Sequence, residues 1–161
     1  MSADGGVVVG TSVGDDPTAY NAHAFRWTQS SNMMVDLGVL PGYDDVRARG
    51  VSADGRVVVG LSRGIHHSST VTHAFRWTND TGMQSIEDWL ADSGVAVSPD
   101  LVATDATATN ANGGVVVGVL SNYRIFIASS GRGLMTIEDV QDSLRGNATS
   151  LNMGRSAGEL P

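Results

Sequence analysis

The sequence predicts an all-β fold made of repeated four-stranded antiparallel sheets, and three observations support this prediction. A nine-residue phrase ending in Val-Val-Val-Gly occurs three times, at residues 2–10, 52–60 and 110–118. The phrase His-Ala-Phe-Arg-Trp-Thr follows it at 23–28 and 73–78, with a degenerate third copy at 124–128. The first two copies of both phrases are fifty residues apart, and a fixed period of this size indicates one supersecondary unit stacked on its neighbours.

The first half of the second repeat predicts two strands and the turn between them. Residues 47–52 alternate small side chains with larger ones, which suits an inner strand in a place where backbones crowd together. Residues 53–55 predict a turn, because Asp-Gly between two strand-like runs is a strong hairpin signal. Val57, Val58 and Val59 are β-branched without alternation, the pattern of a strand buried on both faces.

The second half of the repeat completes the sheet. In residues 73–78 the period is two, so His73, Phe75 and Trp77 share one face of a strand. A second turn at 79–82 then leads to a short outer strand. Four antiparallel strands per unit describe a propeller blade, so the repeats resemble three blades of an incomplete β-propeller; a stacked β-sandwich or a β-solenoid is the alternative.

Short helices are expected after the outer strands of the last two repeats. Residues 85–88 and 136–139 both have the pattern of a helix-capping box. Apolar residues and a terminal glycine follow each box: Trp89, Leu90 and Gly94 in the first, and Val140, Leu144 and Gly146 in the second. From residue 145 onward the Gly/Ser/Asn-rich composition predicts a linker.

The expected organisation is three β repeats over 1–128, followed by an outer strand, a short helix and a linker over 129–161. The repeats divide at about 1–46, 47–104 and 105–128 with the strand that follows, and an insertion around 90–104 delays the third copy. Met1 stands where Val51 stands in the second repeat, so the first sheet is expected to lack its inner strand, as in a fragment.

Composition excludes several classes of function. The net charge is −7, and all 10 basic residues are Arg. An acidic surface repels phosphate backbones, so nucleic acid is not an expected partner. The chain contains no cysteine, which excludes disulfides and thiolate metal sites. It has no apolar run long enough for a transmembrane helix, and its first residues do not have the pattern of a signal peptide.

The recurring residues are interpreted as structural, and no catalytic, cofactor-binding or metal-ligating residue is predicted. They are Asp4, Gly5, His23, Phe25, Trp27, Asp54, Gly55, His73, Phe75, Trp77, Asn112, Gly113 and Phe126. Asn112 replaces the aspartate in the third copy and keeps the turn without the charge, which argues against a carboxylate site in each repeat. The two histidines are expected to bond neighbouring backbone through a ring nitrogen. Arg26 and Arg76 are expected to pair with a turn aspartate.

Loop residues provide the remaining candidates for ligand binding. Adjacent imidazoles at His66 and His67 could face a ligand, but no further His or Cys stands at metal-ligand spacing, so a solvated loop is favoured. Four pairs of neighbouring acids are predicted to point in different directions, unlike the opposed carboxylates of a glycosidase. They are Asp15–Asp16, Asp44–Asp45, Glu87–Asp88 and Glu138–Asp139. Any ligand is expected at loops on one rim, near 15–16 or 66–67.

The two recurring phrases, together with the Leu-Gly-Val-Leu-Pro-Gly run at 37–42, resemble the HAF repeat of bacterial extracellular proteins over roughly residues 1–128. The stretch at 133–144 resembles the segment that joins such repeats to an autotransporter β-barrel. The resemblance implies a secreted or surface-displayed passenger region, associated with the outer membrane of a Gram-negative bacterium, with 129–161 leading toward a barrel.

The function implied by this resemblance is a non-enzymatic extracellular repeat module that presents loops for binding or adhesion. Its ligand would be a surface glycan or a protein, its other partners would be further repeats of the same or another chain, and it needs no cofactor. A fragment of a propeller-type polysaccharide hydrolase or lyase is the first alternative. A truncated product without activity is the second.

Overall fold

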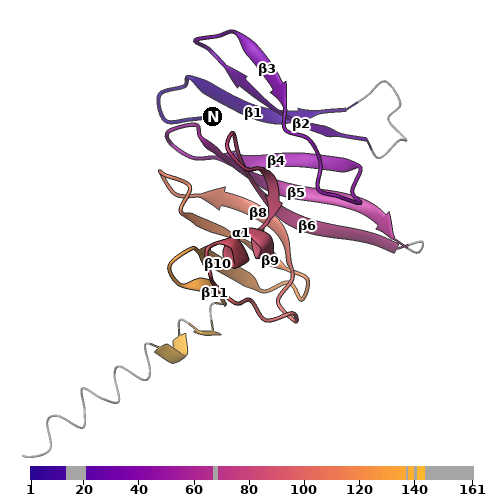
Figure 1. The fold of residues 1–161 in the computed structure, drawn as a ribbon, viewed down its shortest axis with the longest axis vertical. Coiled ribbons are helices and arrows are strands. Elements are labelled where there is room, and N and C mark those ends of the chain that lie inside the picture. The colour runs from indigo at the N-terminus through magenta and orange to yellow at the C-terminus, as the bar shows by residue number, and fades with distance from the viewer. Residues whose placement is uncertain (14–20, 67–68, 137, 140, 144–161) are drawn as a thin grey trace, which may run out of the picture.

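The computed structural model describes residues 1–13, 21–66, 69–136, 138–139 and 141–143. Its strands form three antiparallel sheets that follow one another along the long axis of the molecule (Figure 1). The predicted all-β class and the antiparallel sheets are therefore confirmed. Within the described residues each sheet is open, and none of them closes on itself.

Each sheet corresponds to one sequence repeat. The first contains β1 (Val7–Ser12), β2 (His23–Thr28) and β3 (Met33–Asp36). The second contains β4 (Asp45–Val51), β5 (Val57–His66), β6 (Ser69–Thr78) and β7 (Gly82–Ser85). The third contains β8 (Ala103–Thr109), β9 (Val115–Leu120), β10 (Ile125–Ser129) and β11 (Gly133–Thr136). Among the described strands, the first sheet has no counterpart of the inner strands β4 and β8, as the offset of the first repeat predicted.

The apolar core lies between the sheets, and β5 faces it on both sides. Val58 belongs to the cluster toward the first sheet, whereas Val57 and Val59 belong to the cluster toward the third. Successive side chains of a strand point to opposite faces, so all three valines are buried, as predicted. In β1 and β9, which lie in the first and third sheets, only Val7 and Val116 of the corresponding runs are buried.

A short helix, α1 (Ile86–Asp92), follows β7 and covers the junction between the second and third sheets. The Ser85 hydroxyl caps it by accepting from the Asp88 amide at 3.0 Å. Ile86, Trp89 and Leu90 bury its inner face, so the first predicted helix is confirmed. No helix of the described residues is long and apolar enough to cross a membrane.

The second capping box also forms. The Thr136 amide donates to Asp139 Oδ2 at 2.7 Å, and the Asp139 amide donates back to Thr136 Oγ1 at 3.4 Å. The residues expected to pack and end the helix that follows, Val140, Leu144 and Gly146, lie outside the described residues.

Candidate functional site

The turn that opens each repeat is held by its own side chains. In the second repeat, Asp54 Oδ1 accepts from the Ser52 hydroxyl at 2.5 Å and from the Arg56 amide at 3.1 Å. The Ser52 hydroxyl oxygen accepts from the Val57 amide at 3.0 Å. The hydroxyl of Ser52, followed by the Arg56 amide, holds the pKa of Asp54 below its usual value. The aspartate thus forms the turn, as its residue type predicts.

The third repeat builds the same turn without a carboxylate. Asn112 Oδ1 accepts from the Gly114 amide at 3.0 Å, and Asn110 Oδ1 accepts from the Val115 amide at 3.0 Å. The amide oxygen of Asn110 therefore takes the role of the serine hydroxyl oxygen. This substitution of partners explains why the charge is dispensable in the turn.

The same turns join each sheet to the next one. Arg26 Nε donates to the carbonyl oxygen of Gly55 at 3.0 Å, and Arg76 Nε donates to that of Gly113 at 3.3 Å. The expectation of a turn aspartate as the partner was wrong: the acceptor is the backbone carbonyl one residue later. Val7 and Val57 pack directly against the same two glycines. A side chain at either glycine would collide with the preceding sheet.

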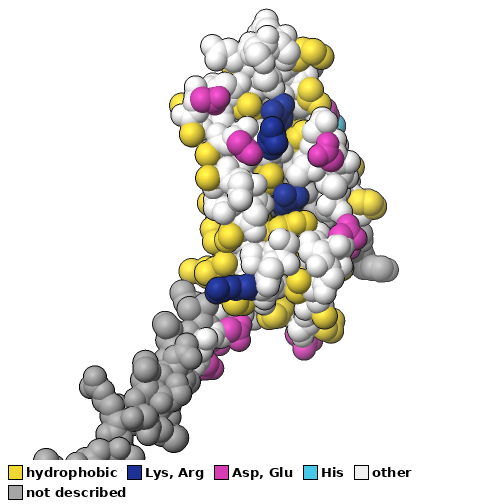
Figure 2. Space-filling view, turned by 60° about the vertical axis from the view of Figure 1, so that its left-hand side comes forward, with side chains coloured by type: hydrophobic (Ala, Val, Ile, Leu, Met, Phe, Trp, Pro, Cys, Tyr) yellow, Lys and Arg dark blue, Asp and Glu magenta, His cyan; other side chains and the backbone are white. Residues whose placement is uncertain are grey.

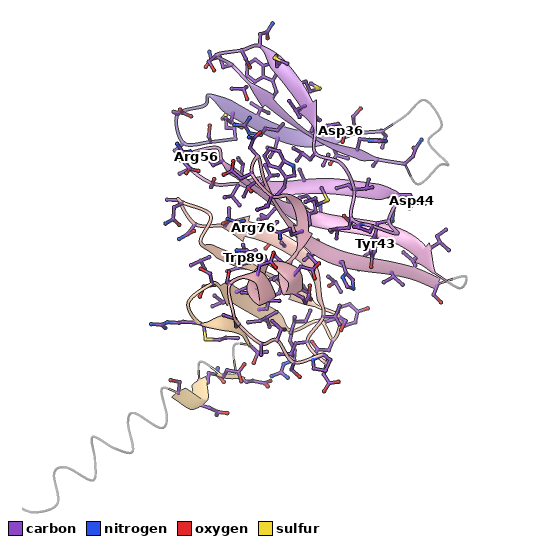
Figure 3. The ribbon with its side chains drawn as sticks, viewed as in Figure 1. Asp36, Tyr43, Asp44, Arg56, Arg76 and Trp89 are labelled. Atoms are coloured by element: carbon purple, nitrogen blue, oxygen red, sulfur yellow. The ribbon has the colours of Figure 1, made fainter. Side chains whose placement is uncertain are left out.

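Arg76 also contacts the helix. Its guanidinium lies 4.9 Å from the centre of the Trp89 ring (Figure 3), a distance at which a cation interacts favourably with an aromatic face. The side chain is half-buried, and this burial lowers the pKa of Arg76. In the third repeat Ile127 stands at the corresponding position, so this repeat carries no arginine for a following turn.

The aromatic residues of the second phrase pack on the first phrase. The rings of Phe25, Phe75 and Phe126 lie against the glycines that end the valine runs, with which they are paired across the strands. Phe75 and Phe126 are fully buried. Because the ring fills the space over the glycine, the two phrases must occur together.

The two histidines have side-chain neighbours. His23 Nδ1 lies 2.7 Å from Asp36 Oδ2, and both side chains are more than half exposed. The ring of His73 lies 5.6 Å from that of Tyr43. The expected backbone partner was therefore wrong for His23, whose partner is a carboxylate on the adjacent strand.

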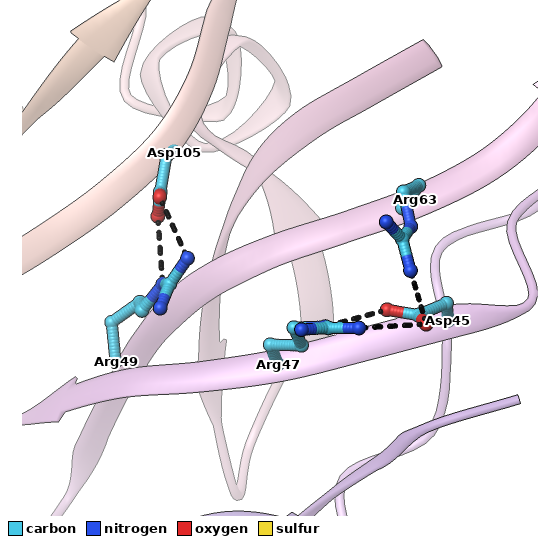
Figure 4. Close-up of polar contacts among 5 residues, drawn as sticks. All are labelled: Asp45, Arg47, Arg49, Arg63 and Asp105. Atoms are coloured by element: carbon cyan, nitrogen blue, oxygen red, sulfur yellow. Dashed lines mark hydrogen bonds and ion pairs between the residues drawn. The ribbon is translucent and has the colours of Figure 1, made fainter. Parts of the chain in front are cut away.

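A cluster of charged residues on β4 and β5 surrounds the buried Asp45. Sequence patterns did not predict this cluster. Asp45 is 1% exposed and accepts from Arg47 Nε at 3.0 Å and from Arg63 Nη2 at 2.9 Å (Figure 4). On the same strand Arg49 pairs with Asp105 of β8 at 3.2 Å, which links the second sheet to the third. The i, i+2 spacing of Asp45 and Arg47 is the signal that could have indicated the first pair.

One of the open hollows on the described surface is lined by three arginines. It has a volume of about 800 Å³ and lies where the turns of the second and third repeats meet the turn between β6 and β7. Three arginines and two carboxylates line it, together with Trp77 and neighbouring neutral residues. The charged residues are Arg26, Arg56, Arg76, Asp54 and Asp80. Figure 2 shows arginine side chains spaced along one face of the stack, with carboxylates beside them.

Of the loop candidates, Asp15, Asp16 and His67 lie outside the described residues. Of the acid pairs, Asp45 is buried while Asp44 is exposed, which agrees with the expectation that neighbours point in different directions. The described part of the chain contains no group of three or more His, Asp or Glu that could hold a metal ion. No protein-family model matches the chain, and no curated protein matches it.

Proposed function

We propose that the chain is a non-enzymatic repeat module of a surface-displayed bacterial passenger, and that it binds a glycan carrying negative charges. The observation that carries this proposal is Arg56, which is exposed in the hollow. The other two repeats have Gly6 and Gly114 at this position, so the turn itself does not require the arginine. The export and display of the module rest on the resemblance to HAF repeats.

A propeller-like arc of sheets is supported by the packing of the inner strands. Gly50 of β4 approaches the backbone of β8 so closely that an added Cβ would lie 3.3 Å from the Thr107 carbonyl oxygen. Arg49 and Asp105 bridge the same two strands. Blades around an axis bring their innermost strands together in this way.

The chemistry of the hollow suits carboxylate or sulfate groups. Guanidinium groups recognise such planar or tetrahedral anions through several N–H donors. Arg56 presents these donors in the open hollow, whereas Arg26 and Arg76 hold turn carbonyls and contribute their positive charge beside it. The net charge of −7 repels a polyanion at longer range, but salt screens that repulsion beyond about 8–10 Å. Thr78, Asn79 and Thr81 add neutral hydrogen-bonding groups along the same wall. Asp54 and Asp80 also line the hollow, so its charged side chains, three Arg and two Asp, have a net charge of +1.

The hydrolase or lyase alternative gains no support in this hollow. A glycosidase needs a carboxylic acid whose pKa is raised so that it stays protonated. The Ser52 hydroxyl and the Arg56 amide lower the pKa of Asp54 instead, which keeps that carboxylate ionised. Asp54 can therefore assist neither as a general acid nor as a neutral donor.

Titration with dextran sulfate and with unsubstituted dextran tests the proposal. We expect the chain to bind only the sulfated polymer, and Arg56→Gly to weaken that binding roughly tenfold, the effect of one charge-assisted contact. The matched control is Arg132→Gly, which removes the same charge from an exposed position in the turn between β10 and β11. Equal weakening by both variants, or equal binding of the two polymers, would refute the proposal.

A further inference from the structure

We propose that the outer edge of β1 is an acceptor site for one more antiparallel strand, of the same type as β4 and β8. The occupant is an extended segment with two small residues at alternate positions, contributed by a further repeat whose inner strand, unlike β4 and β8, is not already paired in a sheet. This inference does not depend on the proposed function.

The first argument is the topology. In the second and third sheets, β4 and β8 cover the edges of β5 and β9, whereas among the described strands β1 pairs only with β2. The exposure of the residues at the ends of these strands differs in the same way. Leu61 and Ser62 of β5 are buried beside β4, while the corresponding residues of β1, Thr11 and Ser12, are exposed.

The second argument is the space at the glycine that ends each valine run. A Cβ added at Gly60 would collide with the carbonyl oxygen of Arg47, and one added at Gly118 with that of Asp105. Gly10 has the Phe25 ring against it but no such carbonyl. β1 thus has, at Gly10, the glycine that permits an inner strand to approach closely. Within the described residues, the space that the inner strand occupies beside Gly60 and Gly118 is free of backbone beside Gly10.

The third argument fixes the chemistry of the occupant. The pairings of β4 with β5 and of β8 with β9 both shift register at small residues, between Ala48 and Gly50 and between Ala106 and Ala108. Ala48 and Ala106 lie opposite the crowded glycines, whereas Gly50 of β4 lies next to Ala108 of the neighbouring inner strand. A strand added to β1 lies beside β4 by the same geometry, so large side chains at these two positions would not fit.

The backbone amide and carbonyl groups on the outer edge of β1 point away from β2, toward the place of the added strand. The Val7 amide donates to Ser2 Oγ at 2.8 Å and the Val7 carbonyl accepts from the Ser2 amide at 2.8 Å, so both groups face away from β2. In an antiparallel pair the direction alternates, and the amides of Val9 and Thr11 therefore face the same open edge. Added strands bind such edges by main-chain hydrogen bonds.

A linked strand tests the proposal. An occupant in the register of β8 would end beside Met1, so the full chain is extended before Met1 by Ala-Thr-Asp-Ala-Thr-Ala, the sequence of residues 103–108. We expect hydrogen-exchange protection of the Val9 and Thr11 amides to rise at least about tenfold. The melting temperature should rise by about 2–4 °C.

Two controls make the test specific. An extension with leucine in place of the last two alanines should give neither change, because the small-residue positions are blocked. Thr11→Pro removes an outward amide and should abolish the gain, while Thr11→Ala should keep it. Unchanged protection in the extended chain, or an equal gain with the leucine extension, would overturn the proposal. So would a dimer of the unextended chain that Thr11→Pro converts to a monomer, because the edge would then belong to a second copy.

Discussion

At the scale of single residues, the turn serine, the turn aspartate and the arginine that the first two repeats share bind backbone groups. Ser52 and Asp54 together accept two amides of their own turn, and Arg26 and Arg76 each hold the turn of the following repeat. A residue engaged in this way is a poor candidate for ligand binding. The residue that departs from the pattern, Arg56, is therefore the informative one.

The turn predicts opposite outcomes for two neighbouring substitutions. Asp54→Asn should change the free energy of unfolding by less than about 0.5 kcal/mol, because an amide oxygen accepts the corresponding backbone amide in the third repeat. Gly55→Val should cost about 2–4 kcal/mol, since Gly55 has φ +72° and Val7 packs against it. Urea denaturation measures both. A large loss of stability with Asp54→Asn would show that the charge matters to the turn.

The Asp45 cluster predicts acid sensitivity. Burial alone raises the pKa of Asp45, but hydrogen bonds from Arg47 and Arg63 outweigh it, so the pKa lies below the ordinary 3.8. The ionised Asp45 carboxylate therefore stabilises the folded state fully above the pKa that Asp45 has in the unfolded chain. This stabilisation is lost as the pH falls through the lower pKa that Asp45 has in the folded protein.

Asp45→Asn should accordingly cost about 1–3 kcal/mol at neutral pH and make the free energy of unfolding less dependent on pH between about 5 and 3. Denaturant titrations across this range measure the effect. Asp44→Asn, at the exposed neighbour, serves as the control and should change the free energy of unfolding by less than about 0.5 kcal/mol at neutral pH. A parallel pH dependence in Asp45→Asn and the unsubstituted chain would disprove the cluster's role.

At the scale of strands, equivalent valines experience different surroundings. Val58 is fully buried between the first and second sheets, whereas Val8, at the same position of β1, is only half-buried. Val58→Ala should cost about 1–2 kcal/mol from lost methyl burial and the cavity left behind, and Val8→Ala should cost less than half of this. Thermal or urea unfolding compares the two. Equal costs would mean that β1 is covered as completely as β5.

Much of the strand pattern could be predicted because it is local. The hairpin signal at 53–55 and the β-branched run that follows it specify a turn and a buried strand without knowledge of distant residues. The contacts of Arg26 and His23 could not be predicted in the same way. Their acceptors, the Gly55 carbonyl and Asp36, meet them only through sheet stacking and strand register, which residue spacing does not give.

At the scale of the whole molecule, the three sheets are joined by the same contacts at both junctions, whereas their surface residues differ between repeats. Each junction uses an arginine, a turn glycine and a valine, first between Arg26 and Gly55 and again between Arg76 and Gly113. The hollow forms where the turns of two repeats meet, so neither repeat could build it alone. The hollow could not be predicted from sequence patterns, because it depends on how the sheets stack.

Amide chemical shifts followed during titration with a short dextran sulfate oligosaccharide test the glycan proposal most directly. We predict that the shifts change around residues 54–57, 76–81 and 112–113, which line the hollow or adjoin it, while those of β3 and β11 stay constant. Arg56→Gly should reduce the changes without moving them elsewhere. Shift changes centred on another face, or none at saturating oligosaccharide, would contradict a binding role for the hollow.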